Sequence, residues 1–156
     1  MIVRAEPLTF EVVYRQERPG LVRLSHLLTG SNAVAEEVVQ EAFLELHRRW
    51  GGIANPKAYV TRAVVNRSRS VLRRRAVERR YAPADARVTL PPEIDETWTA
   101  LARLPAKRRV ALVLRYYEDR PIVEIAELMQ VRPGTVKSLI HRGLASLKEQ
   151  LKEHLS

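Results

Sequence analysis

Residues 121–151, PIVEIAELMQVRPGTVKSLIHRGLASLKEQL, decide the fold of the C-terminal part of the chain. Apolar residues recur at helical spacing on both sides of a short connection, so the stretch predicts a helix over 121–129 and a second over 133–151. Ala126 is small where two such helices would cross, Val131 is apolar in the turn, and Val136 follows Ala126 by ten residues. This spacing predicts a helix-turn-helix. A plain helical hairpin is the alternative.

The second helix of this motif begins with polar and basic side chains. In a helix-turn-helix, the early positions of the second helix enter the major groove of DNA and contact base edges. The side chains predicted to do so are Thr135, Lys137, Ser138, His141 and Arg142.

Composition limits the classes of function. The chain has 156 residues, a net charge of +9 and no cysteine, so we expect a polyanionic partner and no disulfides. Because we find no long apolar run and no secretory signal, we expect no membrane association and a cytoplasmic location. There is no Gly-rich phosphate loop, nucleophile arrangement or metal-ligand cluster. We therefore expect no enzyme activity, no cofactor and no metal.

The positive charge is concentrated in two segments. Residues 1–60 are neutral, 61–81 carry +7, 82–100 carry −3 and 101–156 carry +5. The acidic segment contains three prolines, which disfavour helix. This pattern predicts an all-α protein with two small helical domains, residues 1–81 and 98–156, joined by a flexible linker over 82–97.

Three helices are predicted in the first domain. Thr9 can cap the first, which we expect to be broken at Pro19-Gly20 and to end near Gly30. Ser31 or Asn32 can cap the second, through about residue 50. Asn55 and Pro56 form an N-cap and first-turn pair for the third, through roughly residue 75.

The third helix carries the arginines, with Arg62, Asn66, Ser70 and Arg73 along one face. Arginine neutralises phosphate, and an amide can read a base edge, so this mixture favours DNA contact over a merely solvated face. In the second domain, a helix over 105–117 is predicted to expose Lys107, Arg108 and Arg109 near its start. These cations would serve a partner or simply be solvated.

Three stretches together resemble a known family: LLTGSNAVAEEVVQEAFLELHRRW (27–50), NPKAYVTRAVVNRSRSVLRRR (55–75) and LPAKRRVALVLRYYEDRPIVEIAELMQVRPGTVKSLIHRGLASLKEQL (104–151). They are similar to extracytoplasmic-function sigma factors, and within them to the actinobacterial SigE-like subfamily. The resemblance implies a factor that binds core RNA polymerase and directs promoter-specific transcription initiation. A stand-alone helix-turn-helix regulator is the alternative.

The resemblance also implies site residues and partners. The first domain would bind the clamp helices of the largest polymerase subunit and the second domain the flap of the second subunit, and an anti-sigma factor is a further expected partner. Implied polymerase contacts are Glu37, Gln40, Glu41, Phe43 and Leu44. Implied contacts to the minus-ten element are Gly52, Ile53, Ala54, Asn55, Arg62, Asn66, Ser70 and Arg73, and those to the minus-thirty-five element are Arg132, Thr135, Lys137, Ser138, His141 and Arg142.

The chain departs from the family's pattern at the corner of the helix-turn-helix. Gln130 stands where the family commonly has glycine, so we expect a left-handed residue with a Cβ, at a cost of roughly 1 kcal/mol. Arg120-Pro121 and Arg132-Pro133 replace the usual serine caps, which weakens capping but keeps proline at a tolerated position.

Overall fold

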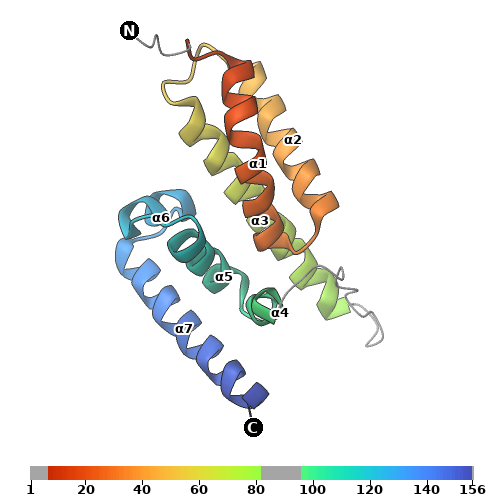
Figure 1. Cartoon of the computed structure of the whole chain (residues 1–156), viewed down its shortest axis with the longest axis vertical. Coiled ribbons are helices and arrows are strands. Elements are labelled where there is room, and N and C mark those ends of the chain that lie inside the picture. Colours follow the sequence, from red (N-terminus) through yellow and green to blue (C-terminus); the bar gives the residue numbers. More distant parts are fainter. Residues whose placement is uncertain (1–6, 82–95, 156) are drawn as a thin grey trace, which may run out of the picture.

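The computed structural model describes residues 7–81 and 96–155, and there the chain is helical, as predicted (Figure 1). The predicted linker lies almost entirely outside these residues. The helices are α1 (Phe10–Thr29), α2 (Asn32–Arg48), α3 (Pro56–Tyr81), α4 (Glu96–Ala102), α5 (Ala106–Leu112), the π-helical turn η1 (Val113–Tyr117), α6 (Ile122–Met129) and α7 (Pro133–Leu155).

Helices α1, α2 and α3 pack together as one bundle around fully buried aliphatic side chains. Each helix contributes to this core, for example through Leu24, Leu46 and Val64. The three predicted N-caps are confirmed, because side-chain oxygens of Thr9, Ser31 and Asn55 each accept a hydrogen bond from the backbone N–H three residues further on. Such caps satisfy donors that the first helical turn leaves unpaired.

The predicted break in the first helix is wrong. α1 continues through Pro19, which is exposed, and ends at Gly30 in a left-handed conformation. Proline removes one hydrogen bond from the helix. Because Pro19 lies on the outer side, water can solvate the carbonyl that this proline leaves without a donor. On the inner side, Leu21, Leu24 and Leu28 are buried and hold both halves of α1 against the bundle.

Helices α6 and α7 form the predicted helix-turn-helix. Ala126 and Val136 are buried where the two helices cross. Gly143 allows α7 to approach α5, because a Cβ at that position would lie 2.8 Å from a methyl carbon of Leu112. Leu144, the next residue on α7, is 42% exposed.

The corner between these helices has the expected left-handed residue, Gln130, with φ 57° and ψ 44°. Its backbone N–H donates to the carbonyl of Glu127, and the N–H of Val131 donates to that of Ala126. This pair of hydrogen bonds is the Schellman arrangement that ends many helices, usually with glycine at the left-handed position. The corner therefore has the geometry of a glycine turn without the glycine.

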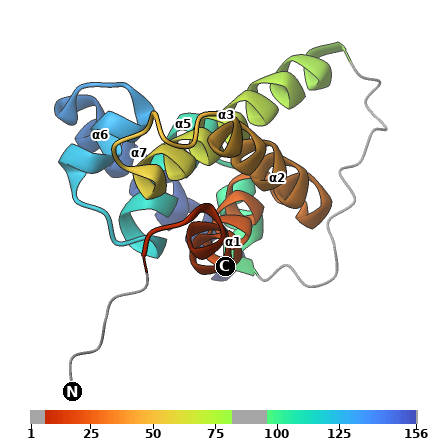
Figure 2. The same cartoon turned by 90° about the horizontal axis from the view of Figure 1, so that it is seen from above.

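The bundle and the helix-turn-helix lie against each other. Helix α3 contacts α5 and α6, and both views place these helices side by side (Figures 1 and 2). The continuous apolar core includes Val65 and Leu72 of α3 together with Ile125 and Met129 of α6. In this structure the two parts of the chain thus share one core.

The expected exposure of Arg109 is wrong, whereas Lys107 is exposed and Arg108 half-buried. Arg109 is 5% exposed, and its guanidinium donates hydrogen bonds to the carbonyls of Leu28, Leu101, Ala102 and Leu104. These carbonyls lie at or just beyond the C-terminal ends of α1 and α4, where helices leave acceptors unpaired. Arg109 thus has a structural role.

Candidate nucleic-acid interface

The exposed side of α3 presents the side chains that the sequence placed on one face. Arg62, Ser70 and Arg73 are exposed and Asn66 is half-buried between them. Ser70 donates a 3.1 Å hydrogen bond from Oγ to the carbonyl of Asn66, a contact within the helix that uses no side-chain atom of Asn66. We refer to Arg62, Asn66, Ser70 and Arg73 as the α3 polar face.

Several other arginines of α3 already have partners within the protein. Arg69 donates to the carbonyl of Met129, and Arg75 to that of Thr29. Arg67 forms ion pairs with two glutamates of α2. The exposed arginines among residues 61–78 are Arg62, Arg73 and Arg74. The charge of the helix therefore overstates the number of cations that face a partner.

A hollow of about 360 Å³ lies beside the α3 polar face, between α2 and α3. Its walls combine an aromatic ring, an amide and charges of both signs, which suits a planar polar group better than an apolar one. The residues around it are Glu45, Tyr59, Arg62, Ala63, Asn66 and Arg67.

Within this hollow, the Tyr59 hydroxyl donates a 2.8 Å hydrogen bond to Oε1 of Glu45. This hydrogen bond lowers the pKa of Glu45 below its ordinary value, with a further contribution from Arg67 and against the opposing effect of burial. Burial raises the pKa of Tyr59, as does its bond to Glu45. At neutral pH, Glu45 is therefore a carboxylate and Tyr59 a neutral phenol.

The loop before α3 is open to solvent. Gly52, Ala54 and Asn55 are exposed, and Ile53 packs partly against the core. Gly51 has φ 96°, a conformation that favours glycine. Asn55 uses its side-chain oxygen to cap α3, so the loop leads directly into the helix that carries the α3 polar face.

On α2, four of the five side chains expected to contact polymerase are exposed: Glu37, Gln40, Glu41 and Leu44, here named the α2 face. Phe43 is a correction to that set. It is 2% exposed, with its ring packed edge-on against Phe10 and Tyr14, so it supports the α2 face from beneath.

The start of α7 is an exposed polar surface. Pro133 and Gly134 lie in its first turn, and nothing lies within 4 Å of a Cβ built on Gly134, so a partner can approach the backbone there. All six side chains expected at this surface are exposed, and we name them the α7 face: Arg132, Thr135, Lys137, Ser138, His141 and Arg142.

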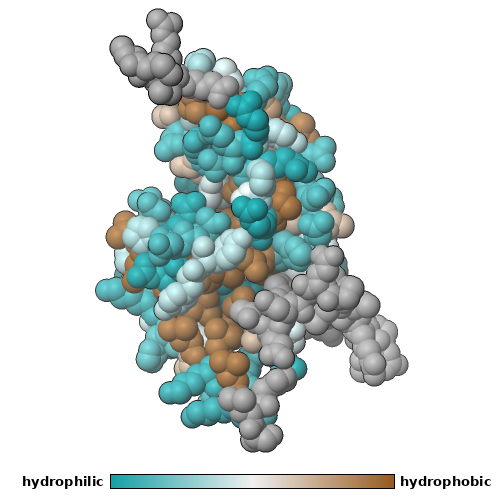
Figure 3. All heavy atoms as spheres, in the orientation of Figure 1, coloured by the Kyte–Doolittle hydropathy of each residue, from teal (hydrophilic) through white to brown (hydrophobic). Residues whose placement is uncertain are grey.

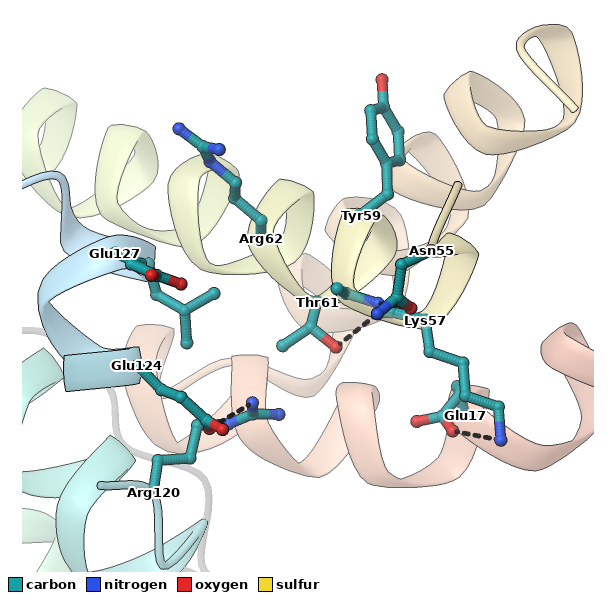
Figure 4. A pocket seen from close by; sticks show the side chains of 11 residues that line it. Glu17, Asn55, Lys57, Tyr59, Thr61, Arg62, Arg120, Glu124 and Glu127 are labelled. Carbon is teal, nitrogen blue, oxygen red and sulfur yellow. Dashed lines mark hydrogen bonds and ion pairs between the residues drawn. The ribbon is translucent and has the colours of Figure 1, made fainter. Parts of the chain in front are cut away.

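A second hollow, of about 700 Å³, lies where α1, α3 and α6 meet (Figure 4). Lys57 is 3.6 Å from Glu17 on one side of it, and Arg120 is 3.4 Å from Glu124 on another. Figure 4 shows Arg62 projecting from the opposite side of α3 to Lys57. The Lys57–Glu17 pair thus joins α3 to α1, Arg120 and Glu124 both lie at the start of α6, and Arg62, which also lines the hollow, is exposed.

Over residues 7–81 and 96–155, histidine, aspartate and glutamate form no group able to hold a metal ion. In the same residues, no helix combines the length and apolar character of a membrane span.

Known proteins match this chain along nearly its whole length. A family model for sigma-70 region 2 matches residues 13–78, and one for sigma-70 region 4 matches residues 94–147. The RNA polymerase sigma-E factor of Streptomyces antibioticus is 32% identical, over 96% of this chain and 88% of that protein. The ECF RNA polymerase sigma factor SigM of Mycobacterium tuberculosis is 30% identical, over 96% of this chain and 80% of that protein.

The chain belongs to the extracytoplasmic-function sigma factors of RNA polymerase.

As a sigma factor, the protein binds core RNA polymerase and promoter DNA and directs transcription initiation, and it is not an enzyme. The match of residues 13–78 to region 2 decides against a stand-alone helix-turn-helix regulator. The predicted resemblance to SigE-like factors is confirmed by the Streptomyces relative.

Solved structures of other proteins have the same fold. RpoE from Bartonella quintana, in complex with the anti-sigma factor NepR, matches with a TM-score of 0.72 at 22% identity, over 92% of this chain and 96% of that one. CnrH, in complex with the cytosolic domain of CnrY, matches with a TM-score of 0.69 at 19% identity, over 92% and 88%.

The hollow between α2 and α3 was not predicted from the sequence. Tyr59, Ala63 and Arg67 follow one another at intervals of four residues, so they line one side of α3. That spacing is visible in the sequence. The glutamate that completes the hollow, Glu45, comes from another helix, and its position depends on how α2 and α3 pack.

Proposed function

We propose that this sigma factor recognises the minus-ten element with its first domain, through the α3 polar face and the loop residues Gly52, Ile53, Ala54 and Asn55. One observation carries this proposal: Asn66 lies at the rim of a polar hollow with exposed arginines at either end of the face. The amide can pair with a base edge while Arg62 and Arg73 neutralise phosphates. Extruding a base costs a few kcal/mol, which such contacts would offset.

The α7 face is proposed to recognise the minus-thirty-five element. Its side chains are exposed over the first turns of the second helix of a helix-turn-helix, the part that enters the major groove in this motif. Lys137 and Arg142 supply charge, and Thr135, Ser138 and His141 supply hydrogen-bonding groups.

The α2 face is proposed to bind the clamp helices of the largest polymerase subunit. It combines the exposed carboxylates of Glu37 and Glu41 with an exposed apolar side chain, Leu44, which is 49% exposed.

For the flap of the second subunit, we propose an apolar stripe on α7, Leu144, Leu147 and Leu151. Hydrophobic atoms gather over the region of α5 and α7 in Figure 3. Exposed apolar patches commonly mark protein interfaces.

We further infer a cytoplasmic location and an anti-sigma partner, with functional domains 1–81 and 98–156 separated by a linker over 82–97. The absence of cysteine and of a membrane-spanning helix within 7–81 and 96–155 supports this location. The solved complex of RpoE with the anti-sigma factor NepR supports an anti-sigma partner of the same general kind.

Site-specific photocrosslinking tests this assignment of surfaces. A photoreactive residue at position 66, 138 or 40 is introduced into the full chain, which is then assembled with core polymerase on a promoter. Position 66 should crosslink to the minus-ten region, 138 to the minus-thirty-five region and 40 to the largest subunit. Crosslinks of position 66 to protein alone, with intact open complexes, would contradict the proposal.

A further inference from the structure

Arg67 connects the α2 face to the α3 polar face. Its Nη1 lies 2.9 Å from Oε2 of Glu41, and its Nη2 lies 3.1 Å from Oε2 of Glu45. Glu41 belongs to the α2 face, whereas Arg67 follows Asn66 directly on α3 and lines the same hollow. A single guanidinium therefore touches the proposed polymerase-binding surface and the edge of the proposed DNA-binding surface.

The two glutamates hold this guanidinium in different ways. Glu45 is itself fixed, because Tyr59 donates a hydrogen bond to its other oxygen. The side chain of Glu41, by contrast, is 51% exposed and contacts Arg67 through Oε2. Glu45 therefore anchors Arg67 beside the hollow, and Glu41 is the partner that a second molecule can reach.

While both glutamates are engaged, Arg67, Glu41 and Glu45 together carry a net negative charge, which does not attract a phosphate. Each of the two terminal nitrogens of Arg67 contacts one carboxylate, and the combined charge of the two carboxylates exceeds that of the guanidinium. Ion pairs between groups this exposed are weak, so a basic partner surface that binds Glu41 would displace Arg67 from it. The guanidinium would then keep one carboxylate and have Nη1 available for a phosphate oxygen.

We propose that Arg67 is a DNA-phosphate-binding residue that Glu41 masks in the free factor and that polymerase binding at the α2 face unmasks. The proposal rests on the proposed roles of the α2 face and the α3 polar face, and it adds a residue and a route of coupling to them. The masking explains why fewer cations of α3 would contact DNA in the free protein than the total charge of α3 suggests.

A double-mutant cycle on the full chain, without polymerase, tests the masking. The probe is a fluorescent single-stranded oligonucleotide of about 20 nucleotides and mixed sequence, titrated by anisotropy at several salt concentrations. Arg67→Ala is introduced into three backgrounds: the native chain, Glu41→Gln, and Glu36→Gln. The last is the matched control, because Glu36 is an exposed acid on the same helix that pairs with Arg18.

Arg67→Ala should change affinity by less than about twofold in the native chain and in Glu36→Gln, where Arg67 stays masked. In Glu41→Gln it should weaken binding by about fivefold and reduce the slope of log K against log salt by about 0.7, the value for one phosphate of a single strand. An equal effect of Arg67→Ala in all three backgrounds, whether large or absent, would overturn the masking.

Thermal unfolding monitored by circular dichroism shows whether each variant folds. If Arg67→Ala does not fold, Arg67→Gln replaces it, because glutamine retains hydrogen-bonding capacity without the charge. In a second arm, the effect of Arg67→Ala on oligonucleotide affinity is measured with core polymerase present. The loss of affinity there should match the loss seen in the Glu41→Gln background. No loss there would overturn the unmasking by polymerase.

The two arms separate this proposal from the proposed function. The cycle on the free protein does not depend on polymerase binding or on promoter sequence. The cycle could show that Glu41 masks Arg67 while position 40 gives no crosslink to the largest subunit. That result would contradict the proposed polymerase contact and would still support the masking.

Discussion

The guanidinium of Arg69 donates a 2.9 Å hydrogen bond to the main-chain carbonyl of Met129, and this contact ties α3 to the end of α6. Met129 is the last residue of α6, so its carbonyl has no donor within the helix. Arg69 is 9% exposed, and burial lowers its pKa from the ordinary value. Arg69 thus serves as a C-terminal cap provided from a distant part of the chain.

Replacing Arg69 with alanine should therefore destabilise the packing between the two domains. The variant leaves a buried carbonyl without a donor, which typically costs about 1–3 kcal/mol. We expect a lower free energy of unfolding in urea and a larger radius of gyration by small-angle X-ray scattering. Arg74→Ala is the control, because Arg74 is exposed on the same helix. This variant should change the free energy of unfolding by no more than about 0.5 kcal/mol. Equal losses for the two variants would contradict a capping role for Arg69.

Glycine at position 130 should stabilise the protein. Gln130 occupies a left-handed conformation, which glycine adopts without the steric cost of a Cβ. Gln130→Gly should raise the free energy of unfolding by about 0.5–1 kcal/mol, and the melting temperature by about 2–4 °C per kcal/mol. Gln130→Ala keeps the Cβ and should show no comparable gain. A lower melting temperature for the glycine variant would show that the side chain of Gln130 makes a compensating contribution.

Much of the local structure followed from sequence patterns that act over a few residues. The three N-caps, the helix-turn-helix spacing and the left-handed corner at Gln130 depend on neighbouring residues, and all are confirmed. The continuity of α1 through Pro19 was missed, because local preference predicts a break. Burial of the leucines on the inner side of α1 outweighed that preference.

Two buried arginines show what local sequence patterns do not contain. Arg109 was predicted to be exposed and Arg69 was given no role, and both are buried and donate to carbonyls near helix ends. The partner of Arg69 is 60 residues away along the chain, and Arg109 donates to one carbonyl 81 residues away as well as to three within eight residues. Such contacts depend on how the two domains pack, and no pattern within either helix specifies that packing.

Acid should weaken the bundle through Glu45. The pKa of Glu45 is lowered in the folded protein, chiefly by the hydrogen bond from Tyr59, from an ordinary value of 4.5. A carboxyl with a lowered folded pKa contributes stability above its unfolded pKa, and this contribution is lost as the pH falls through the folded value. The stability difference between the native chain and Glu45→Gln should therefore be constant above about pH 5.5 and shrink below about pH 4.5. Urea unfolding across this range measures it. A pH-independent difference would contradict the lowered pKa.

Asn66→Ala and Gln40→Ala should impair different steps. Asn66 lies on the α3 polar face and Gln40 on the α2 face, and both are in positions where alanine leaves the core intact. Asn66→Ala should reduce promoter opening, by about 1–3 kcal/mol if it contacts a base edge, with little effect on core binding. Gln40→Ala should weaken core binding first. Permanganate footprinting measures opening, and fluorescence titration with core polymerase measures binding. Equal losses in both assays would contradict the division of roles between the two faces.

Run-off transcription with core polymerase, the full chain and a library of promoters tests the central claim most directly. We expect promoter-specific transcripts that require the protein, that are reduced with Asn66→Ala, and whose templates share two upstream elements. Absence of promoter-specific product with folded protein that binds core polymerase would contradict the account, as would full activity of Asn66→Ala on every template.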